Sequence, residues 1–413
     1  MNTLPSPPSP SPSPSLTSLP VHPKLAGSHE PCDDQERAQV FQEIAARSVP
    51  VEHKGLPERL RQLSQFILTQ PIEALLTLGL ALLALQLLSL ALNWGVLHAV
   101  FQIDEGACQS ARGEGACWGM VGEKFRMILW GRYPYAEQWR CALSCALALG
   151  MLGWSVGSKA WTSKLRTITL WAWVITGLVI QALMSGNFLG LRVLPLWPSV
   201  ETELWGGLPL TLILSLGSIA LATPMGILLA LGRTSEMPII QSICVLYIEL
   251  VRGVPLISVL FMASFMFPLL MPTLQTPDVL IRVLLGITLF SAAYTAEVVR
   301  GGLQAVDKGQ LEAAQSLNLG YWQTQRHVIL PQALAHIIPG MVNNFIAIFK
   351  DTSLVTIVSL YELTGALGLA LNGDANWRPY KLEGYLFIAA IYFFFCFALS
   401  RVSQNLEHRL ANR

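Results

Sequence analysis

Charged side chains occur near the ends of otherwise apolar stretches, where a charge is costly unless it is paired. In SAAYTAEVVRGG, Glu297 lies three residues before Arg300, so the two can pair on one helix face. In YIELVRGVP, Glu249 and Arg252 have the same spacing. For Glu249 and Arg252, a structural ion pair is the favoured interpretation, and a gating role is the alternative.

A second polar group lies in MVNNFIAIFKDTSLVTIV. Asn343 and Asn344 lie seven residues before Lys350 and Asp351, hence on nearly the same face of a helix. Polar residues inside a membrane usually face a bundle interior or an aqueous cavity. One hypothesis is a path for a zwitterionic solute, and the alternative is a buried pair that only fixes packing. The predicted path residues are Glu297, Asn343, Asn344, Lys350, Asp351, Thr352 and Ser353.

No combination of residues favours catalysis. The seven histidines are scattered, and no nucleophile, base and metal-ligand cluster gathers at one depth. The chain has no G-x-x-x-x-G-K-[ST] loop to cradle phosphates, so we expect no cofactor or metal bound by this chain. A net charge of +1 argues against a nucleic-acid partner.

The elements that would position these residues are membrane spans. The 413 residues are 53% hydrophobic and 13% charged, whereas soluble domains carry about 25% charge. We therefore expect an all-α polytopic protein in a lipid bilayer, with about eight helices of about 20 residues. They are expected at 72–100, 138–157, 167–184, 207–231, 253–272, 280–299, 336–358 and 384–402.

The composition changes along the chain. A proline- and serine-rich arm without a core is expected to be disordered, and a polar segment follows it. Lysine and arginine are more frequent on the side of the N-terminus, which predicts cytoplasmic N- and C-termini. The expected parts are 1–31 (arm), 32–71 (cytoplasmic), 72–205 (three spans with an external loop at about 102–137), 206–405 (core) and 406–413 (tail).

Two of the seven cysteines, Cys108 and Cys117, share the expected external loop. A disulfide can form there in an oxidising compartment. Two free thiols are the simpler alternative, and the sequence leaves both open.

A polar segment, LEAAQSLNLGYWQTQRHVILPQA, interrupts the apolar half on the expected cytoplasmic side. Asp307 and Gln310 have the spacing of a capping box, which begins a short helix. Asn318 and Gly320 tolerate left-handed backbone and should end it. A second short helix is expected at 321–329, with Pro331 ending it or beginning the next span. Apolar residues gather at the turn, which favours a docking surface over a plain loop.

This segment resembles the EAA loop of binding-protein-dependent ABC importer permeases, in which E-A-A is followed by a glycine and later by I-x-L-P. YIELVRGVP, AAYTAEVVRGGLQAV and FKDTSLVTIV resemble the polar amino-acid branch, over about 206–405. Upstream, GACWGMVGEKFRMILWGRYPYAEQWR and LPLWPSVETELWGGLPLTL resemble general L-amino-acid permease subunits with extra N-terminal spans. The motif's glycine is Asn318 here and its isoleucine is Val328, with Leu330 and Pro331 closing the motif.

The resemblance implies a type I ABC importer core with a cytoplasmic coupling loop at about 301–333. It implies these partners: an ATPase subunit dimer, which would bind ATP and Mg, a second homologous permease chain, and a periplasmic amino-acid-binding protein. It also implies a bacterial inner-membrane location. The residues that would dock the ATPase are Glu312, Ala313, Ala314, Leu317, Asn318, Gly320 and Tyr321.

A different class, a stand-alone secondary transporter, would show inverted repeats and paired broken helices. The sequence shows no convincing repeat, and that class leaves the polar segment unexplained. The permease subunit is therefore the favoured interpretation.

Overall fold

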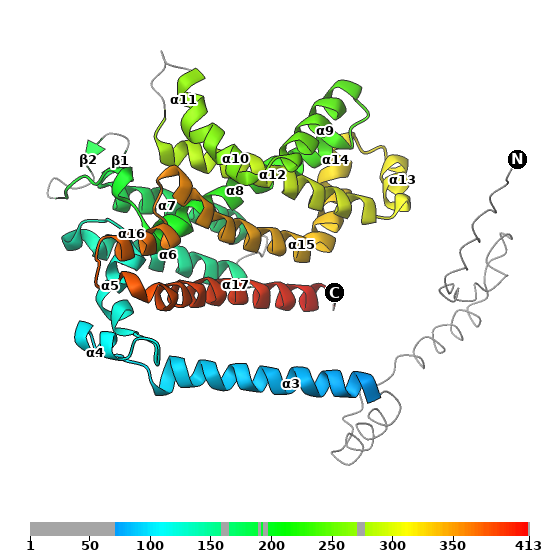
Figure 1. Cartoon of the computed structure of the whole chain (residues 1–413). Coiled ribbons are helices and arrows are strands. Elements are labelled where there is room, and N and C mark those ends of the chain that lie inside the picture. Colours follow the sequence, from blue (N-terminus) through cyan, green and yellow to red (C-terminus); the bar gives the residue numbers. More distant parts are fainter. Residues whose placement is uncertain (1–70, 158–164, 189–190, 193–196, 271–276, 412–413) are drawn as a thin grey trace, which may run out of the picture. The chain divides into compact units, whose positions relative to one another are not determined.

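The computed structural model describes residues 71–157, 165–188, 191–192, 197–270 and 277–411. These residues are almost entirely helical, as predicted (Figure 1). Their one sheet is an antiparallel pair of two-residue strands, β1 (Asn187–Phe188) and β2 (Leu191–Arg192). The predicted arm (1–31) and nearly all of the predicted cytoplasmic segment (32–71) lie outside the described residues.

Six of the described helical stretches are long and apolar enough to cross a membrane, and a bent pair can make a seventh. The six are Ile72–Leu97, Thr167–Ser185, Gly207–Arg233, Val279–Ala305, Tyr321–Val358 and Arg378–Glu407. The second predicted span forms helix α6 (Gln138–Val156), which is not among the six. The protein is therefore a multi-pass membrane protein.

The fifth predicted span, 253–272, differs in the structure. Helix α9 (Pro238–Gly253) and the stretch Leu256–Leu270 form a pair bent by 103°. Val254 has extended backbone (φ −106°, ψ 136°) because it precedes Pro255, which disfavours helical geometry there. The chain is therefore broken before this proline, and the predicted fifth span corresponds to the second member of the bent pair, Leu256–Leu270. Beyond the break lie α10 (Leu256–Phe261), the π-helical turn η5 (Met262–Met266) and α11 (Phe267–Leu270).

The chain divides into two compact units, Met1–Leu85 and Gln86–Arg413. Helix α3 (Pro71–Leu92) begins in the first unit and ends in the second, followed by the π-helical turn η1 (Asn93–Leu97). Its leucines are exposed all around it, as expected of a span surrounded by lipid.

Helices α8 (Gly207–Arg233) and α12 (Val279–Ala305) form the centre of the second unit. The small residues Ser218, Ala222, Gly226 and Ala230 of α8 are all buried. A Cβ atom on Gly226 would lie 2.6 Å from the Thr295 side chain of α12. This stripe of small residues, spaced four apart on one helix face, therefore packs two helices within the chain. Helix α15 (Leu330–Asp351) packs on both α12 and α8.

One end of the spans is covered by a folded segment, residues 98–131, which we call the cap. It contains α4 (Glu105–Ser110) and α5 (Gly119–Trp130). Cys108 and Cys117 form a disulfide inside it, with their Cα atoms 5.4 Å apart, which decides between the two alternatives that the sequence left open. The short helices η2 (Tyr135–Glu137) and η4 (Thr202–Leu204) lie in the connections that follow.

Contacts distant in the sequence attach the cap to the last helices, α16 (Leu363–Asn372), η8 (Arg378–Tyr380) and α17 (Lys381–Ala411). The Lys124 ammonium lies 2.8 Å from the Asp374 carboxylate. The Cys117 N–H donates to the buried Glu383 carboxylate at 3.0 Å. The cap buries its disulfide against an apolar cluster that includes Leu367 and Trp377.

Candidate coupling segment and polar membrane sites

Residues 307–329, which we call the coupling segment, lie at the other end of the spans from the cap (Figure 1). Helix α13 (Lys308–Ser316) follows α12 directly. Asp307 caps it, since its carboxylate accepts from the Gly309 N–H at 2.7 Å. The start of the helix is thus where the sequence predicted it.

The end of α13 is a left-handed turn. Asn318 has φ +54°, one of two non-glycine residues with positive φ among those described. The Leu319 N–H donates to the Ala314 carbonyl at 3.2 Å, and the Asn318 N–H to Gln315 at 2.8 Å. These two hydrogen bonds give the last carbonyl groups of α13 the donors that the ended helix no longer supplies. The predicted turn is confirmed, with Asn318 rather than Gly320 in the left-handed conformation, because Gly320 has φ −67°.

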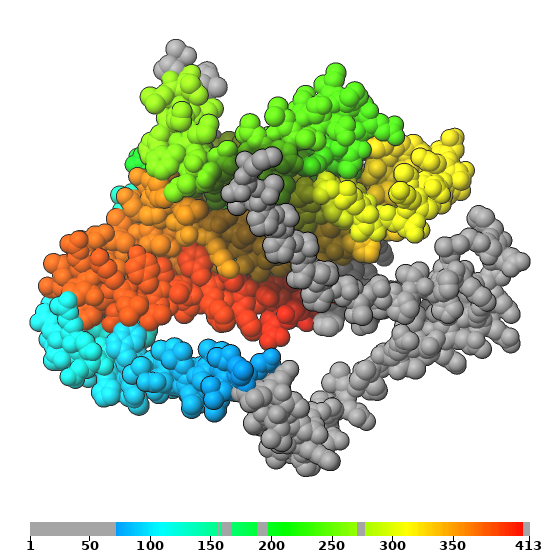
Figure 2. All heavy atoms as spheres, turned by 45° about the vertical axis from the view of Figure 1, so that its right-hand side comes forward, coloured from blue at the N-terminus to red at the C-terminus, as the bar shows by residue number. Residues whose placement is uncertain are grey.

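The docking residues predicted on this segment are mostly exposed. Ala314 is buried and anchors α13, whereas Glu312, Ala313, Asn318 and Gly320 are exposed. Leu317 is 74% exposed, and Trp322, beside the half-exposed Tyr321, is 67% exposed. The space-filling view shows this segment standing at the surface (yellow in Figure 2). An apolar tip on a polar, exposed segment is typical of a surface that a partner covers.

The second short helix expected at 321–329 does not end at Pro331. Helix α14 (Tyr321–Thr324) continues through the π-helical turn η6 (Gln325–Ile329) into α15. Pro331 therefore lies inside a continuous helical stretch, directly after the π-helical turn.

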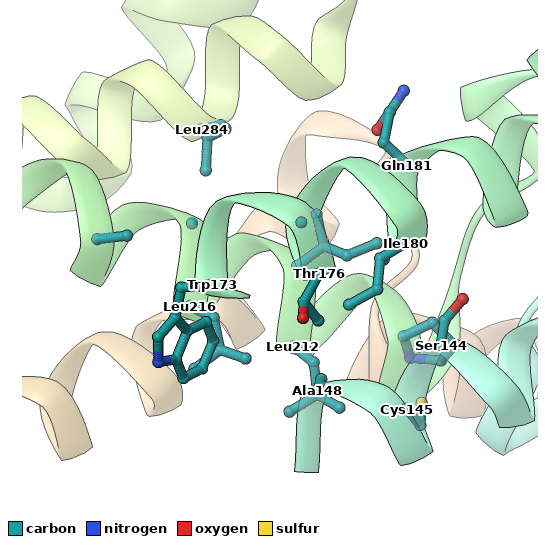
Figure 3. A pocket seen from close by; sticks show the side chains of 15 residues that line it. Ser144, Cys145, Ala148, Trp173, Thr176, Ile180, Gln181, Leu212, Leu216 and Leu284 are labelled. Carbon is teal, nitrogen blue, oxygen red and sulfur yellow. The ribbon is translucent and has the colours of Figure 1, made fainter. Parts of the chain in front are cut away.

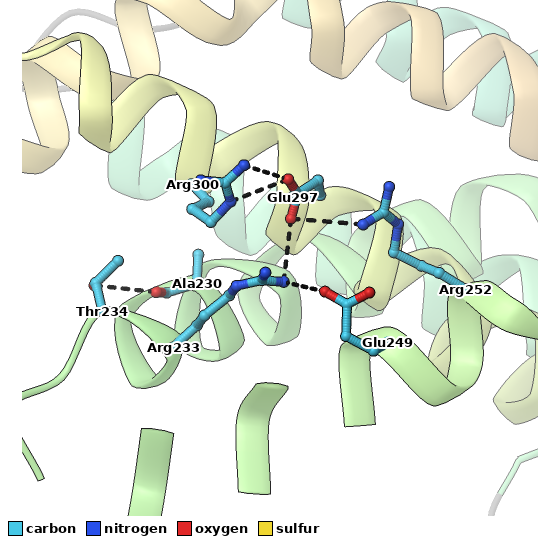
Figure 4. A network of polar contacts seen from close by, with 7 residues as sticks. All are labelled: Ala230, Arg233, Thr234, Glu249, Arg252, Glu297 and Arg300. Atoms are coloured by element: carbon cyan, nitrogen blue, oxygen red, sulfur yellow. Dashed lines mark hydrogen bonds and ion pairs between the residues drawn. The ribbon is translucent and has the colours of Figure 1, made fainter. Parts of the chain in front are cut away.

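Glu297, in the last third of α12, is the centre of an ion cluster that joins α8, α9 and α12 (Figure 4). Its carboxylate accepts from the Arg300 Nε at 3.0 Å, which confirms the predicted pair. It also lies 3.3 Å from Arg233 of α8 and 3.7 Å from Arg252 of α9. Three guanidinium groups therefore share one carboxylate.

The second predicted pair is replaced by longer-range contacts. Glu249 pairs with Arg233 at 3.0 Å, and Arg252 turns to Glu297 instead of Glu249. Arg233 was not predicted here, because it is 64 residues from Glu297 in the sequence. The cluster can hold α8, α9 and α12 in one arrangement and release them together.

The amide and charged residues of α15 lie on one continuous helix, as predicted. Asn343 and Lys350 are both exposed, and Asn344 turns inward to donate to the Thr295 hydroxyl of α12 at 2.8 Å. His336, seven residues before Asn343, is also exposed on this helix. Its spacing of seven residues from Asn343 was the sequence signal that could have added His336 to the predicted path residues.

The remaining predicted path residues divide between two environments. Thr352 is fully buried and its hydroxyl donates to the Phe349 carbonyl at 2.8 Å, while Asp351 and Ser353 are half-buried. They lie in or beside η7 (Thr352–Val358), the turn that ends α15. Glu297 belongs to the ion cluster, and no described contact joins it to Lys350 or Asp351.

A buried carboxylate that the sequence did not single out lies between η7 and α16. Glu362 has no exposed surface. It accepts from the Thr364 N–H at 2.8 Å, the Gly365 N–H at 3.1 Å and the Tyr392 hydroxyl at 2.7 Å. Burial raises the pKa of Glu362, and these hydrogen bonds oppose the rise. The described residues place no cation against it, so hydrogen bonds alone satisfy it.

The described residues contain no group of three histidine, cysteine or acidic side chains that could hold a metal ion. The polar features of the site are thus an exposed segment, an ion cluster and a polar helix face. This arrangement can couple a partner to helix movement.

A family model and individual related proteins both identify this chain as a transporter permease. Residues 222–412 match the family described as "Binding-protein-dependent transport system inner membrane component". The Escherichia coli protein named "Inner membrane amino-acid ABC transporter permease protein YhdY" is 48% identical over 340 residues, covering 81% of this chain and 89% of that protein. The Rhodobacter capsulatus protein named "Glutamate/glutamine/aspartate/asparagine transport system permease protein BztC" is 34% identical, covering 89% and 96%.

A solved structure described as an amino acid ABC transporter with histidines is 32% identical, covering 49% of this chain and 92% of that chain, with a TM-score of 0.43. The chain belongs to the family of permease subunits of amino-acid ABC transporters.

Proposed function

We propose that this chain forms the transmembrane half of an importer that moves amino acids from the periplasm to the cytoplasm. ATP and Mg are bound by separate ATPase subunits, and this chain binds neither. The observation that carries the proposal is the coupling segment, whose exposed apolar tip at Leu317 and Trp322 has a firmly capped helix beneath it.

In this proposal α13 lies in a groove of the ATPase dimer, with Glu312 on its exposed face. Closure of the ATPase would move α13, which follows α12 after only two residues. The ion cluster around Glu297 lies in α12 near that junction and also holds α8 and α9. Movement of α13 would therefore shift α8, α9 and α12 together.

We also propose the orientation and the other partners. Disulfides persist in oxidising compartments, so the Cys108–Cys117 bond favours a periplasmic cap. The coupling segment would then face the cytoplasm with both termini, in the bacterial inner membrane. A periplasmic amino-acid-binding protein would deliver the solute on the cap side. A second homologous permease chain would complete the path.

The polar face of α15 is the proposed path. Asn343 and Lys350 are exposed seven residues apart on a helix that crosses the membrane, where an unpaired polar side chain facing lipid is costly. A cavity shared with the second permease chain would solvate them. The Lys350 ammonium would then attract the α-carboxylate of the passing amino acid.

The docking proposal is tested by reversing a charge on α13. Glu312→Lys, in the complete importer in vesicles, is expected to lower ATP-driven uptake about tenfold, the factor for 1.4 kcal/mol of lost docking energy. The control is Glu407→Lys, the same reversal near the end of α17, where the carboxylate accepts only from the neighbouring Ser403 hydroxyl. Both variants must insert equally. Uptake by Glu312→Lys equal to that of the control would contradict docking at α13.

The path is tested separately with Lys350→Gln, which should lower uptake while the amount of purified complex stays the same. Lys381→Gln, at the first residue of α17, is the matched control. If Lys350→Gln reduces only the yield of complex, and surviving molecules transport normally, the residue serves packing and not the path.

A further inference from the structure

An apolar groove lies between the extra N-terminal spans and the core. Its walls come from α6, from α7 (Leu165–Ser185) and from α8, and Leu284 of α12 closes one side (Figure 3). The groove has a volume of about 210 Å³. None of the proposed coupling or path residues lines it.

Small side chains on facing helices create this groove. Ala148, Gly177, Gly217 and Ala220 all line it. A Cβ atom added to Gly177 would meet no atom within 4 Å, so the space in front of this glycine is empty of protein. Helix α6 packs on both α7 and α8. The hollow lies between α7 and α8, in front of α6.

The start of α6, the end of α7 and the start of α8 lie together at one end of the groove. The Tyr133 hydroxyl, just before α6, donates to the Met184 carbonyl in the last turn of α7 at 2.8 Å. The Val200 N–H, shortly before α8, donates to the Ser185 carbonyl at 2.9 Å. At 1.5 Å per residue, Pro209 lies about 3 Å from this end of α8 and Ala220 about 20 Å from it. The groove therefore runs along about one leaflet of a 30 Å hydrocarbon core.

Polarity changes along the groove. Ser144 and Gln181 lie at the end near the helix termini, whereas Trp173 and Leu216 lie at the other end (Figure 3). Ser144 is only 2% exposed, and its hydroxyl has no hydrogen-bond partner among the described residues. A buried hydroxyl without a partner is costly. Trp173 has its partner already, because its indole N–H donates to the Ser155 hydroxyl at 2.8 Å.

We propose that this groove binds one phospholipid of the surrounding bilayer, with an acyl chain between α7 and α8. The ester oxygens at the head of the chain would accept from the Ser144 hydroxyl and the Gln181 amide. An amino acid does not fit, because the lining offers its two charges no ion-pair partner. The lipid would fill the space between the extra spans and the core, so the two move as one body.

The test uses the complete importer in vesicles that contain phosphatidylethanolamine with a diazirine in the middle of one acyl chain. Light should attach this probe to the wild-type chain within 173–181 or 209–220. Gly177→Leu fills the empty space and should lower that labelling about tenfold, the factor for 1.4 kcal/mol of binding energy. Leucine is also the better helix former, so the variant should fold.

The control is Gly150→Leu on α6. A Cβ atom there also meets nothing within 4 Å, but Gly150 does not line the groove, so labelling should stay at the wild-type level. Labelling that persists in Gly177→Leu would overturn the proposal. So would a wild-type groove that takes no label, which is the result expected if a protein helix occupies it. Neither outcome bears on ATPase docking at α13.

Discussion

The two ends of the helical bundle are built differently. At the cap end, a disulfide closes a local loop, and the Lys124–Asp374 pair and the Glu383 hydrogen bond join residues more than 200 positions apart. At the coupling end, α13 is held by its own caps, by the buried side chain of Ala314 and by an exposed hydrogen bond at 3.1 Å from the Gln332 amide to the Gln310 side chain. Contacts between distant parts of the chain thus hold the cap end in place, whereas mostly local contacts hold the coupling end.

The difference concerns polar groups as much as apolar ones. At the cap end, Glu362 is buried and its oxygens are occupied by donors from the chain itself. At the coupling end, Glu312 is exposed and has no described side-chain partner. The exposed apolar tip at Leu317 and Trp322, together with the exposed Glu312 carboxylate, is typical of a surface that binds another protein.

The largest effect that would test this comparison is expected from Glu362→Ala. The change removes the acceptor of two backbone N–H groups and the Tyr392 hydroxyl, all at the buried end. Unpaired buried donors cost about 1–3 kcal/mol each, so the variant should lose about 3 kcal/mol or more of unfolding free energy. Thermal unfolding of the purified complex measures this loss.

Glu362→Gln supplies the control, since it keeps one acceptor oxygen and should lose less. It also tests protonation. Burial raises the pKa of Glu362, so the stability it provides is complete below the ordinary pKa of a glutamate and declines as the pH rises through the raised value. The wild type should lose stability over that window, and Glu362→Gln should not. Equal pH profiles for the two proteins would mean that Glu362 is not the titrating group.

A somewhat smaller effect is expected when the disulfide is removed by Cys108→Ser together with Cys117→Ser. The bond closes a loop between residues nine positions apart, for which chain entropy predicts about 2.5 kcal/mol. Hydrogen exchange should accelerate across 98–119 and stay unchanged in α13. Acceleration at both ends would show that the ends are coupled in stability, against the comparison made above.

The smallest effect is expected at the turn of the coupling segment. Asn318→Val places a branched side chain at φ +54° and should cost about 1–2 kcal/mol, felt mainly in α13. Faster hydrogen exchange in 313–320 with an unchanged melting temperature is the expected result. Asn318→Gly should slow the same exchange slightly, because glycine adopts this conformation freely. A melting temperature lowered as much as in the disulfide variant would place α13 in the cooperative core.

The coupling segment was predictable because its signals are local. A capping aspartate, an asparagine at the turn and the spacing between them lie within twelve residues. The stripe of small residues on α8 was predictable for the same reason, since it follows the period of one helix. The partner of that stripe, Thr295 on α12, was not.

The cap was predicted only as an external loop. Its helices α4 and α5 and its partner α16 are short, and the contacts that hold them cross 250 or more residues. The exchange of partners in the ion cluster has the same origin. A spacing of three residues made Glu249 and Arg252 neighbours, but the packing of α8 and α12 against α9 paired Glu249 with Arg233 and Arg252 with Glu297.

The sequence by itself determined most of the stretches that cross the membrane, the break at Pro255 and the turn of the coupling segment, because hydropathy, proline and left-handed backbone act over a few residues. Only the tertiary structure decided which side chains meet. It joined Cys108 to Cys117, gathered three arginines around Glu297, buried Glu362 and left a groove beside Gly177. Those outcomes depend on how separate helices pack, and no local pattern encodes the distance between them.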